Sequence, residues 1–209
     1  MVAKRQMLLL GQVLQVRLAI FDFDGTLTTK DSLNEFLKYS VSKPTYYINM
    51  LIFAPLFVLY KLKILDNSYT KEKLFKLFFD NMDENEFKTL AQNFSKQKIP
   101  TIIRDEIYTK FKQHIKEGNR VIVVSASIEC YLMPWTKQEN VELLSTQLLF
   151  ENGRFKGKFL TKNCHGIEKL KRINAHLDTT KYKEIFAYGD SDSGDKYIWK
   201  IADHKIKVK

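Results

Sequence analysis

The sequence is poor in the residue types that identify several classes of protein. Its 209 residues include only two cysteines, Cys130 and Cys164, which lie far apart and in no CxxC or Cys/His spacing. This argues against a disulfide framework and a zinc site, and it favours a reducing compartment. Internal repeats and low-complexity tracts are missing, as are signatures that interleave aromatics and glycines for RNA binding. We therefore expect no nucleic-acid partner.

Arginine is also scarce, with only six residues and none between positions 18 and 103. Lys and Arg together number 34 against 24 Asp and Glu, so the formal net charge of +10 comes mostly from lysine. Such an excess favours encounters with anions, including phosphorylated metabolites and anionic lipid. A lysine-rich, solvated surface without any partner is the alternative explanation.

What the sequence does contain is enough apolar material for one substantial core, since 44% of its residues are hydrophobic. The N-terminal run Met7–Leu10 follows Lys4 and Arg5 and is faintly similar to a signal peptide. It is short and has no small-residue cleavage site, so we interpret it as a leader into the first strand.

Three short apolar runs that end in polar residues predict buried strands, at residues 17–23, 120–125 and 184–190. Helical periodicity lies between and after them, at 101–117 and 166–176. Strands that alternate with helices predict an α/β fold with a parallel sheet covered on both faces. In such sheets ligands bind at the carboxyl ends of the strands.

The stretch 31–100 has helical periodicity and no convincing strand, so we expect an all-helical insertion directly after the first strand. The predicted division is a core domain of residues 1–30 and 101–209 and a helical cap domain of residues 31–100. Further along, Val141–Phe159 predicts a β-hairpin around an Asn-Gly turn.

The strongest chemical signal is a pair of carboxylates, Asp22 and Asp24, at the end of the first predicted strand. Alternation along a strand places both on one face. Two like charges held that close are costly unless a cation lies between them or one is protonated, and either arrangement is chemically useful. A turn with incidental acids is the alternative for the Asp-Gly dipeptide alone.

The full segment Asp22-Phe-Asp-Gly-Thr-Leu-Thr28 closely resembles the first motif of the haloacid dehalogenase-like superfamily. The resemblance implies a Rossmann-like, doubly wound parallel sheet with an inserted all-helical cap. It implies that Asp22 is the nucleophile that forms an aspartyl phosphate and that Asp24 is the general acid and base. It also implies that the backbone carbonyl of Phe23 binds magnesium and that Thr26 contacts the substrate.

Two further segments resemble the second and third motifs of this superfamily. Ser125 ends an apolar run and resembles the hydroxyl that hydrogen-bonds the transferring phosphoryl group, with Ala126 beside it as a second substrate contact. Lys169 resembles the lysine that neutralises charge on the nucleophile and the phosphate. Without that context, a solvated helical lysine and a strand-ending serine are the ordinary interpretations.

The acidic segment 189–195 resembles the fourth motif. Its two acids are often four residues apart, whereas Asp190 and Asp195 are five apart, and Asp192 is the reserve candidate. Magnesium prefers hard oxygen ligands and takes few carboxylates. The resemblance implies Mg²⁺ as the cofactor, at a metal site that draws on the four carboxylates Asp22, Asp24, Asp190 and Asp195.

The helical insertion is typical of the subclass that contains phosphoserine phosphatases, and segments 124–131 and 164–169 look most like its branch with bacterial phosphatidylglycerophosphate phosphatases. Phosphoserine phosphatases usually hold the amino acid with a Glu after the first motif and an Arg in the cap. This sequence has Asp31 at the first place, as a candidate substrate-binding residue, and no Arg in the cap. Bidentate carboxylate recognition favours Arg over Lys, so a free amino acid is the less expected substrate.

Residues 44–60 carry no charge and are mostly large and apolar, and Lys61 and Lys63 follow. The run is interrupted by Asn49 and Pro55 and is short for a bilayer crossing. Peripheral contact of residues 44–63 with an anionic lipid surface is one expectation. A buried cap helix that packs on its neighbours is the alternative.

Together these patterns predict a magnesium-dependent phosphomonoester hydrolase that acts on a lipid phosphate such as phosphatidylglycerophosphate. We expect it in the cytoplasm, at the inner face of the cytoplasmic membrane if the lipid contact holds. A soluble phosphatase for a small metabolite such as phosphoserine is the main alternative. A non-catalytic binding module is a remote one, because such modules typically lose the nucleophile or the lysine and this chain keeps both.

Overall fold

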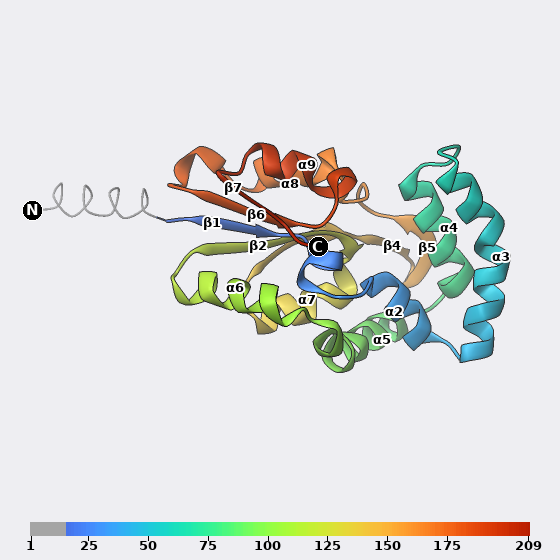
Figure 1. Ribbon diagram of the computed structural model, residues 1–209. Coiled ribbons are helices and arrows are strands. Elements are labelled where there is room, and N and C mark those ends of the chain that lie inside the picture. Colours follow the sequence, from blue (N-terminus) through green and yellow to red (C-terminus); the bar gives the residue numbers. More distant parts are fainter. Residues whose placement is uncertain (1–15) are drawn as a thin grey trace, which may run out of the picture.

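The computed structural model describes residues 16–209, so the predicted leader at Met7–Leu10 lies outside the described residues. Within this range five strands form one parallel sheet in the order β3-β2-β1-β6-β7, with β1 at its centre (Figure 1). They are β1 (Leu18–Phe21), β2 (Arg120–Ile128), β3 (Glu142–Thr146), β6 (Ile185–Gly189) and β7 (His204–Lys207). The three predicted strands are therefore confirmed as β1, β2 and β6, the three in the middle of the sheet.

Helices cover both faces of this sheet, as buried parallel strands require. In Figure 1 one pair lies above the sheet and another below it. These are α8 (Ile167–His176) and α9 (Asp192–Lys200) above, and α6 (Asp105–Lys116) and α7 (Glu129–Gln138) below. Strand β1 alternates between the two layers, because Leu18 and Ile20 join the apolar cluster of α8 and α9 while Ala19 and Phe21 join the other. The predicted α/β class is confirmed.

The predicted helical insertion is also confirmed. Four helices occupy it: α2 (Ser32–Ser40), α3 (Lys43–Lys61), α4 (Asn67–Phe79) and α5 (Glu84–Gln97). Each follows a residue whose side chain accepts a hydrogen bond from a first-turn N–H group, and these capping residues are Asp31, Ser42, Asp66 and Asp83. The short turns η2 (Ile99–Ile102) and η3 (Thr179–Lys181) complete the helical elements after α5.

Aromatic packing ties the inserted helices to the layer below the sheet. The ring of Phe36 in α2 lies 5.2 Å from that of Phe94 in α5 and 5.0 Å from that of Tyr131 in α7, measured between centroids. All three side chains are fully buried. The boundary between a core of residues 1–30 and 101–209 and a cap of residues 31–100 stays a prediction, since one apolar cluster runs across it.

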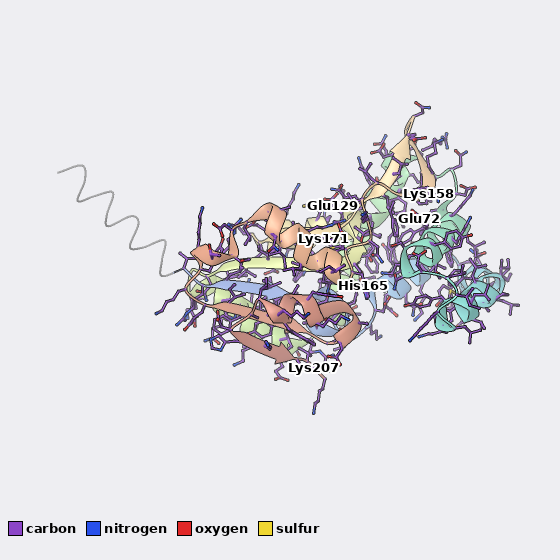
Figure 2. The ribbon with its side chains drawn as sticks, turned by 90° about the horizontal axis from the view of Figure 1, so that it is seen from above. Glu72, Glu129, Lys158, His165, Lys171 and Lys207 are labelled. Atoms are coloured by element: carbon purple, nitrogen blue, oxygen red, sulfur yellow. The ribbon has the colours of Figure 1, made fainter. Side chains whose placement is uncertain are left out.

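The hairpin predicted for Val141–Phe159 is correct only in its second half. Strands β4 (Leu148–Glu151) and β5 (Arg154–Phe159) form the antiparallel pair, whereas Glu142–Thr146 is β3 and pairs in parallel with β2. The hydroxyl of Thr146 donates to the carbonyl of Ala126 over 3.1 Å, which fixes the end of β3 on the main sheet. The hairpin itself joins α4, where Lys158 donates to Glu72 over 3.0 Å (Figure 2).

Candidate active site

The candidate catalytic residues come from three neighbouring strands. Asp22 directly follows β1, Ser125 lies in β2, and Asp190 directly follows β6. Because β2, β1 and β6 are adjacent and parallel, their carboxyl ends meet at one edge of the sheet. The inserted helices begin at the same edge, because α2 starts directly after Asp31, a short loop beyond the end of β1 at Phe21.

A buried lysine joins two of the acids. Lys169, in the first turn of α8, donates to Asp22 Oδ1 and to Asp195 Oδ1, each over 2.6 Å. Its side chain is only 2% exposed, and Asp195 is fully buried. One oxygen of each of Asp22, Asp190 and Asp195 lies within 4.8 Å of the others. The structure therefore brings together the predicted nucleophile, the predicted lysine and both acids of the fourth motif.

Two glycines make this close approach possible. Gly25 has a positive φ of 74°, and a Cβ placed on it would lie 2.3 Å from Asp190 Oδ2. Gly189 ends β6, and a Cβ there would lie 2.6 Å from the carboxylate of Asp195. Asp195 Oδ2 can then accept from the backbone N–H groups of Asp190, at 3.1 Å, and of Ser191. Asp195 thus holds the loop that carries Asp190.

Burial shapes the charges of this cluster. It raises the pKa of Asp22 to about 7, with a further rise from Asp195 that the ammonium of Lys169 opposes. Burial and then Asp195 also raise the pKa of Asp190. Burial works against the charge of Lys169, but Asp22 and Asp195 outweigh it and raise the pKa of that lysine. Three carboxylates therefore share one ammonium group.

This donor set fits a small, hard cation. The three acids offer only oxygen ligands, and two of them, Asp22 and Asp195, share a single ammonium group, that of Lys169. Asp22 and Asp190 are the acids best placed to hold Mg²⁺, because Asp195 already accepts from Lys169 and from two backbone N–H groups. The carboxylate of Asp24 lies outside this cluster.

The backbone carbonyl of Phe23 helps to close the loop η1 (Phe23–Leu27). It accepts a hydrogen bond from the backbone N–H of Thr28 over 3.0 Å. The hydroxyl of Thr28 is 3.2 Å from the same oxygen, but it has one hydrogen to donate and lies closer to the carbonyl of Lys30, at 2.7 Å. Thr28 therefore does not occupy both lone pairs of this oxygen, and the Phe23 carbonyl as a metal ligand stays a prediction.

Asp24 is held by a group of hydroxyls that the sequence reasoning missed. Its Oδ1 accepts from the backbone N–H of Ser32 over 2.7 Å, and its Oδ2 accepts from the hydroxyl of Ser127. The Ser127 hydroxyl in turn lies 3.0 Å from that of Ser32, which donates to the hydroxyl of Tyr131. Burial and then Asp31 raise the pKa of Asp24, while the bonds from Ser127 and Ser32 lower it. Alternation along β2 was the available signal, because it places Ser127 on the same face as Ser125.

The remaining predicted residues differ in their burial and in their hydrogen-bond partners. Ser125 is buried, and its hydroxyl oxygen accepts from the backbone N–H of Ser127 over 3.0 Å. The hydroxyl of Thr26 is buried and has no hydrogen-bond partner among residues 16–209. Asp192, the reserve candidate, is exposed and pairs with Lys207 over 3.0 Å. The structure thus places Asp195, and not Asp192, beside Asp22.

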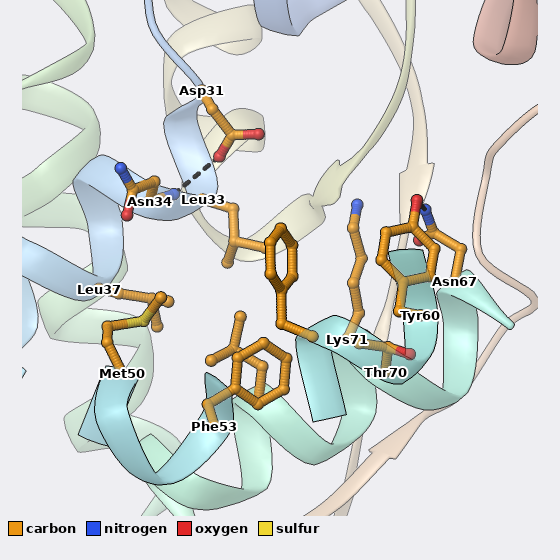
Figure 3. Close-up of a pocket in the computed structure, with 12 residues that line it drawn as sticks. Asp31, Leu33, Asn34, Leu37, Met50, Phe53, Tyr60, Asn67, Thr70 and Lys71 are labelled. Atoms are coloured by element: carbon orange, nitrogen blue, oxygen red, sulfur yellow. Dashed lines mark hydrogen bonds between the residues drawn. The ribbon is translucent and has the colours of Figure 1, made fainter. Parts of the chain in front are cut away.

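A cavity of about 420 Å³ lies between α2, α3 and α4 (Figure 3). Most of its wall is apolar, from side chains that include Leu33, Met50, Phe53, Phe57 and Leu74. Asp31 and Lys71 also line it, and the ammonium of Lys71 lies 3.4 Å from the carbonyl of Ala126, next to Ser125. The cavity therefore adjoins the phosphoryl end of the candidate site. Asp31 also caps α2 by accepting from Asn34 N–H.

Helix α3 is apolar on two faces. Its inner face lines the cavity with Met50, Phe53, Phe57 and Tyr60, at helical spacing. Its outer face is a stripe of exposed apolar side chains, defined by Tyr47, Ile48, Leu51, Ile52, Val58 and Leu59 of the helix and by Leu62, which directly follows it. Leu51 is 76% exposed, and only Tyr46 and Phe53 of this helix are buried. Packing on neighbouring helices thus accounts for the inner face but not for the stripe. No helix of residues 16–209 is long and apolar enough to cross a bilayer.

Comparison with known proteins identifies the family. The family model for haloacid dehalogenase-like hydrolases matches residues 19–194. Protein CicA of Caulobacter vibrioides is 29% identical over 192 residues, which cover 90% of this chain and 84% of CicA.

Two solved structures share the fold. A protein from Bordetella pertussis Tohama I has a TM-score of 0.77 at 18% identity, over 92% of this chain and 90% of that one. A phosphoserine phosphatase, solved as a phospho-aspartyl intermediate analogue, has a TM-score of 0.58 at 16% identity, over 92% and 86% of the two chains.

The fold and the site define a hydrolase whose acids and lysine converge at the carboxyl edge of a parallel sheet. The chain belongs to the haloacid dehalogenase-like hydrolase family, and it is an enzyme of the phosphatase type. The superfamily resemblance expected from the four sequence motifs is therefore confirmed.

Substitution of Ser127 tests the hydroxyl group that holds Asp24. Ser127→Ala removes the donor to Asp24 Oδ2 and leaves the Ser32 N–H in place. A hydrogen bond to a charged group contributes about 1.5–3 kcal/mol. We expect kcat for p-nitrophenyl phosphate to fall about tenfold, with KM little changed.

Ser40→Ala is the matched control, because the Ser40 hydroxyl donates only to the backbone of α2, at Phe36. That variant should keep the wild-type kcat. If Ser127→Ala folds normally, as judged by its thermal melt, and also keeps the wild-type kcat, then Ser127 does not position Asp24 for turnover.

Proposed function

We propose that this enzyme hydrolyses the phosphate monoester of a lipid, such as phosphatidylglycerophosphate, with Mg²⁺ as cofactor. The proposal rests mainly on the two apolar faces of helix α3. One face lines the cavity beside the site, and the other is exposed to solvent. A lipid phosphatase needs both features, because the lipid chains require apolar space next to the phosphoryl site and the enzyme must bind to the lipid surface.

In the proposed reaction Asp22 is the nucleophile. Lys169 holds its Oδ1, so Oδ2 is the oxygen free to attack phosphorus. A bond forms between Asp22 Oδ2 and phosphorus, the bond to the alcohol oxygen breaks, and Asp24 gives its proton to the departing oxygen. Asp24 then takes a proton from the water that attacks the aspartyl phosphate, which releases inorganic phosphate and restores Asp22.

The other residues stabilise charge during this transfer. The hydroxyl of Ser125, with the backbone at Ala126, binds the phosphoryl oxygens, and Thr26 lies in the same loop as the two catalytic acids. Lys169 neutralises the negative charge that collects between Asp22 and the phosphate. Mg²⁺ held by Asp22 and Asp190, with Asp195 in support, would supply further positive charge to the phosphoryl oxygens.

Charge and hydropathy support a peripheral place at a lipid surface. The exposed stripe of α3 has no charged residue between Lys43 and Lys61, and these two lysines and Lys63 are exposed at its ends. Apolar side chains can enter the lipid boundary while lysines meet anionic head groups. The net charge of +10 favours the same surface. We propose contact with the inner face of the cytoplasmic membrane through residues 44–63.

A soluble phosphatase for a small metabolite such as phosphoserine is the second candidate. Asp31 and Lys71 favour it, because they place opposite charges on one cavity wall, as the two ends of an amino acid require. The mainly apolar lining of the same cavity favours the lipid. A non-catalytic module remains the least supported, since the nucleophile, the lysine and the fourth-motif acids all lie together.

The variant Asp22→Asn tests the nucleophile. An amide oxygen is a poor nucleophile, so we expect Mg²⁺-dependent hydrolysis of every substrate to fall by roughly 10³-fold or more. The fold should survive, because Asn has the same shape and removes a carboxylate whose pKa is already raised by burial. A thermal melt within a few degrees of the wild type checks this. Retained turnover in a folded Asp22→Asn variant would falsify the assignment.

The double variant Leu51→Gln with Val58→Gln tests the lipid surface. Both side chains are exposed on the stripe, and burial of a large apolar side chain contributes about 1.5–3 kcal/mol. We expect binding to phosphatidylglycerol-containing vesicles to weaken at least about tenfold, with loss of activity on lipid phosphate in those vesicles. Activity on soluble p-nitrophenyl phosphate should not change.

Leu160→Gln is the matched control, because Leu160 is 61% exposed but lies outside α3. It should bind vesicles as the wild type does. Wild-type protein that hydrolyses soluble esters but neither binds vesicles nor acts on lipid phosphate would leave the soluble phosphatase as the function.

A further inference from the structure

Lys71 connects the cavity to the phosphoryl site. It lies in α4 and lines the apolar cavity, yet its ammonium is 3.4 Å from the carbonyl of Ala126 in β2. Figure 3 shows its chain extended beside Tyr60, with the ammonium at the end away from Phe53 and Met50. A group bound at this ammonium would therefore lie between the reacting phosphate and anything held in the cavity.

The ammonium of Lys71 has unused hydrogen-bonding capacity. It can donate three hydrogen bonds, and among residues 16–209 it donates only to the carbonyl of Ala126, at the long distance of 3.4 Å. No carboxylate of residues 16–209 forms an ion pair with it. Burial lowers the pKa of Lys71, although Asp31, Asp24 and Asp22 act to raise it. A half-buried cation without a counterion is costly unless something binds it.

A purely structural role does not account for Lys71. The nearby link between α4 and the sheet domain is made by neutral groups, because Asn163 Nδ2 donates to Asn67 Oδ1 over 2.9 Å. Glu72 adds a second link through Lys158 and through the backbone N–H of Phe159. Helix α4 is thus fastened on both sides of Lys71 by shorter bonds than the one that Lys71 makes.

We propose that Lys71 binds a second anionic group of the substrate. The leaving alcohol carries this group, at a position between the reactive phosphate and the apolar part of the substrate. The inference rests on the proposed phosphatase function of this site. In a phospholipid the second anion is a phosphodiester, and in a soluble ester it is a carboxylate. The enzyme then prefers a lipid with both a monoester and a diester phosphate over one whose only phosphate is the reacting monoester.

Two matched substrate pairs test this role. The lipid pair is phosphatidylglycerophosphate and phosphatidate in mixed micelles, and the soluble pair is 3-phosphoglycerate and glycerol 3-phosphate. In each pair only the first member carries the second anion. kcat and KM are measured for the wild type, Lys71→Met, Lys71→Arg and Lys96→Met. Lys96 is an exposed lysine of α5, so its variant controls for the loss of one positive charge.

We expect Lys71→Met to lower kcat/KM about 10- to 100-fold on the member with the second anion, chiefly through KM. The loss on the other member should stay below about threefold, and Lys71→Arg should keep most of the preference. The thermal melt of Lys71→Met should equal or exceed that of the wild type, because the variant no longer buries a poorly satisfied cation.

Equal losses on both members of a pair would overturn the inference, because Lys71 would then contact the transferring phosphoryl group. Unchanged kinetics on all substrates would overturn it as well. If the wild type is inactive on both lipids but Lys71→Met selectively loses 3-phosphoglycerate, the lipid function fails while the role of Lys71 stands.

Discussion

The site depends on one buried interaction, the pair of hydrogen-bonded ion contacts from Lys169 to Asp22 and Asp195. Each contact is 2.6 Å long, and the lysine side chain is 2% exposed. Loss of Lys169 would leave both carboxylates buried without their positively charged partner, which is strongly unfavourable. Asp195 also fixes the loop after β6, because its other oxygen accepts a hydrogen bond from the backbone N–H of Asp190. One lysine at the start of α8 thereby orients the ends of two neighbouring strands.

The acidic cluster around Lys169 has less positive than negative charge, which suits the proposed phosphoryl transfer. Three carboxylates share one ammonium, and burial keeps the pKa of Asp22 near 7 and that of Asp190 raised. Such an arrangement is unfavourable for folding and useful for a site that recruits a cation and a phosphate. Burial also raises the pKa of Asp24, but its partners differ, since Ser32 and Ser127 donate to it and oppose that rise. Two acids separated by one residue thus have separate surroundings, as separate roles require.

Much of the site could be predicted because its residues lie near the carboxyl ends of strands. Asp22, Ser125 and Asp190 end apolar runs that are recognisable in the sequence, and the carboxyl ends of parallel strands must meet. The edge strand β7 could not be found this way, because His204–Lys207 is too polar to resemble a buried strand. The split between β3 and the hairpin depends on the bond from Thr146 to Ala126, which joins residues 20 positions apart. Lys71 reaches the site only because α4 packs against both α3 and the hairpin, and no local pattern encodes that packing.

In the proposed reaction the phosphoryl group is transferred to Asp22 first and to water only afterwards. Its most direct test is an acid quench of the wild-type enzyme within milliseconds of mixing with Mg²⁺ and a ³²P-labelled phosphate ester, followed by borohydride reduction and peptide mass spectrometry. We expect acid-stable label on the protein and reduction of an acyl phosphate to homoserine at position 22. Absence of protein-bound label during turnover, or homoserine at another acid, would contradict it.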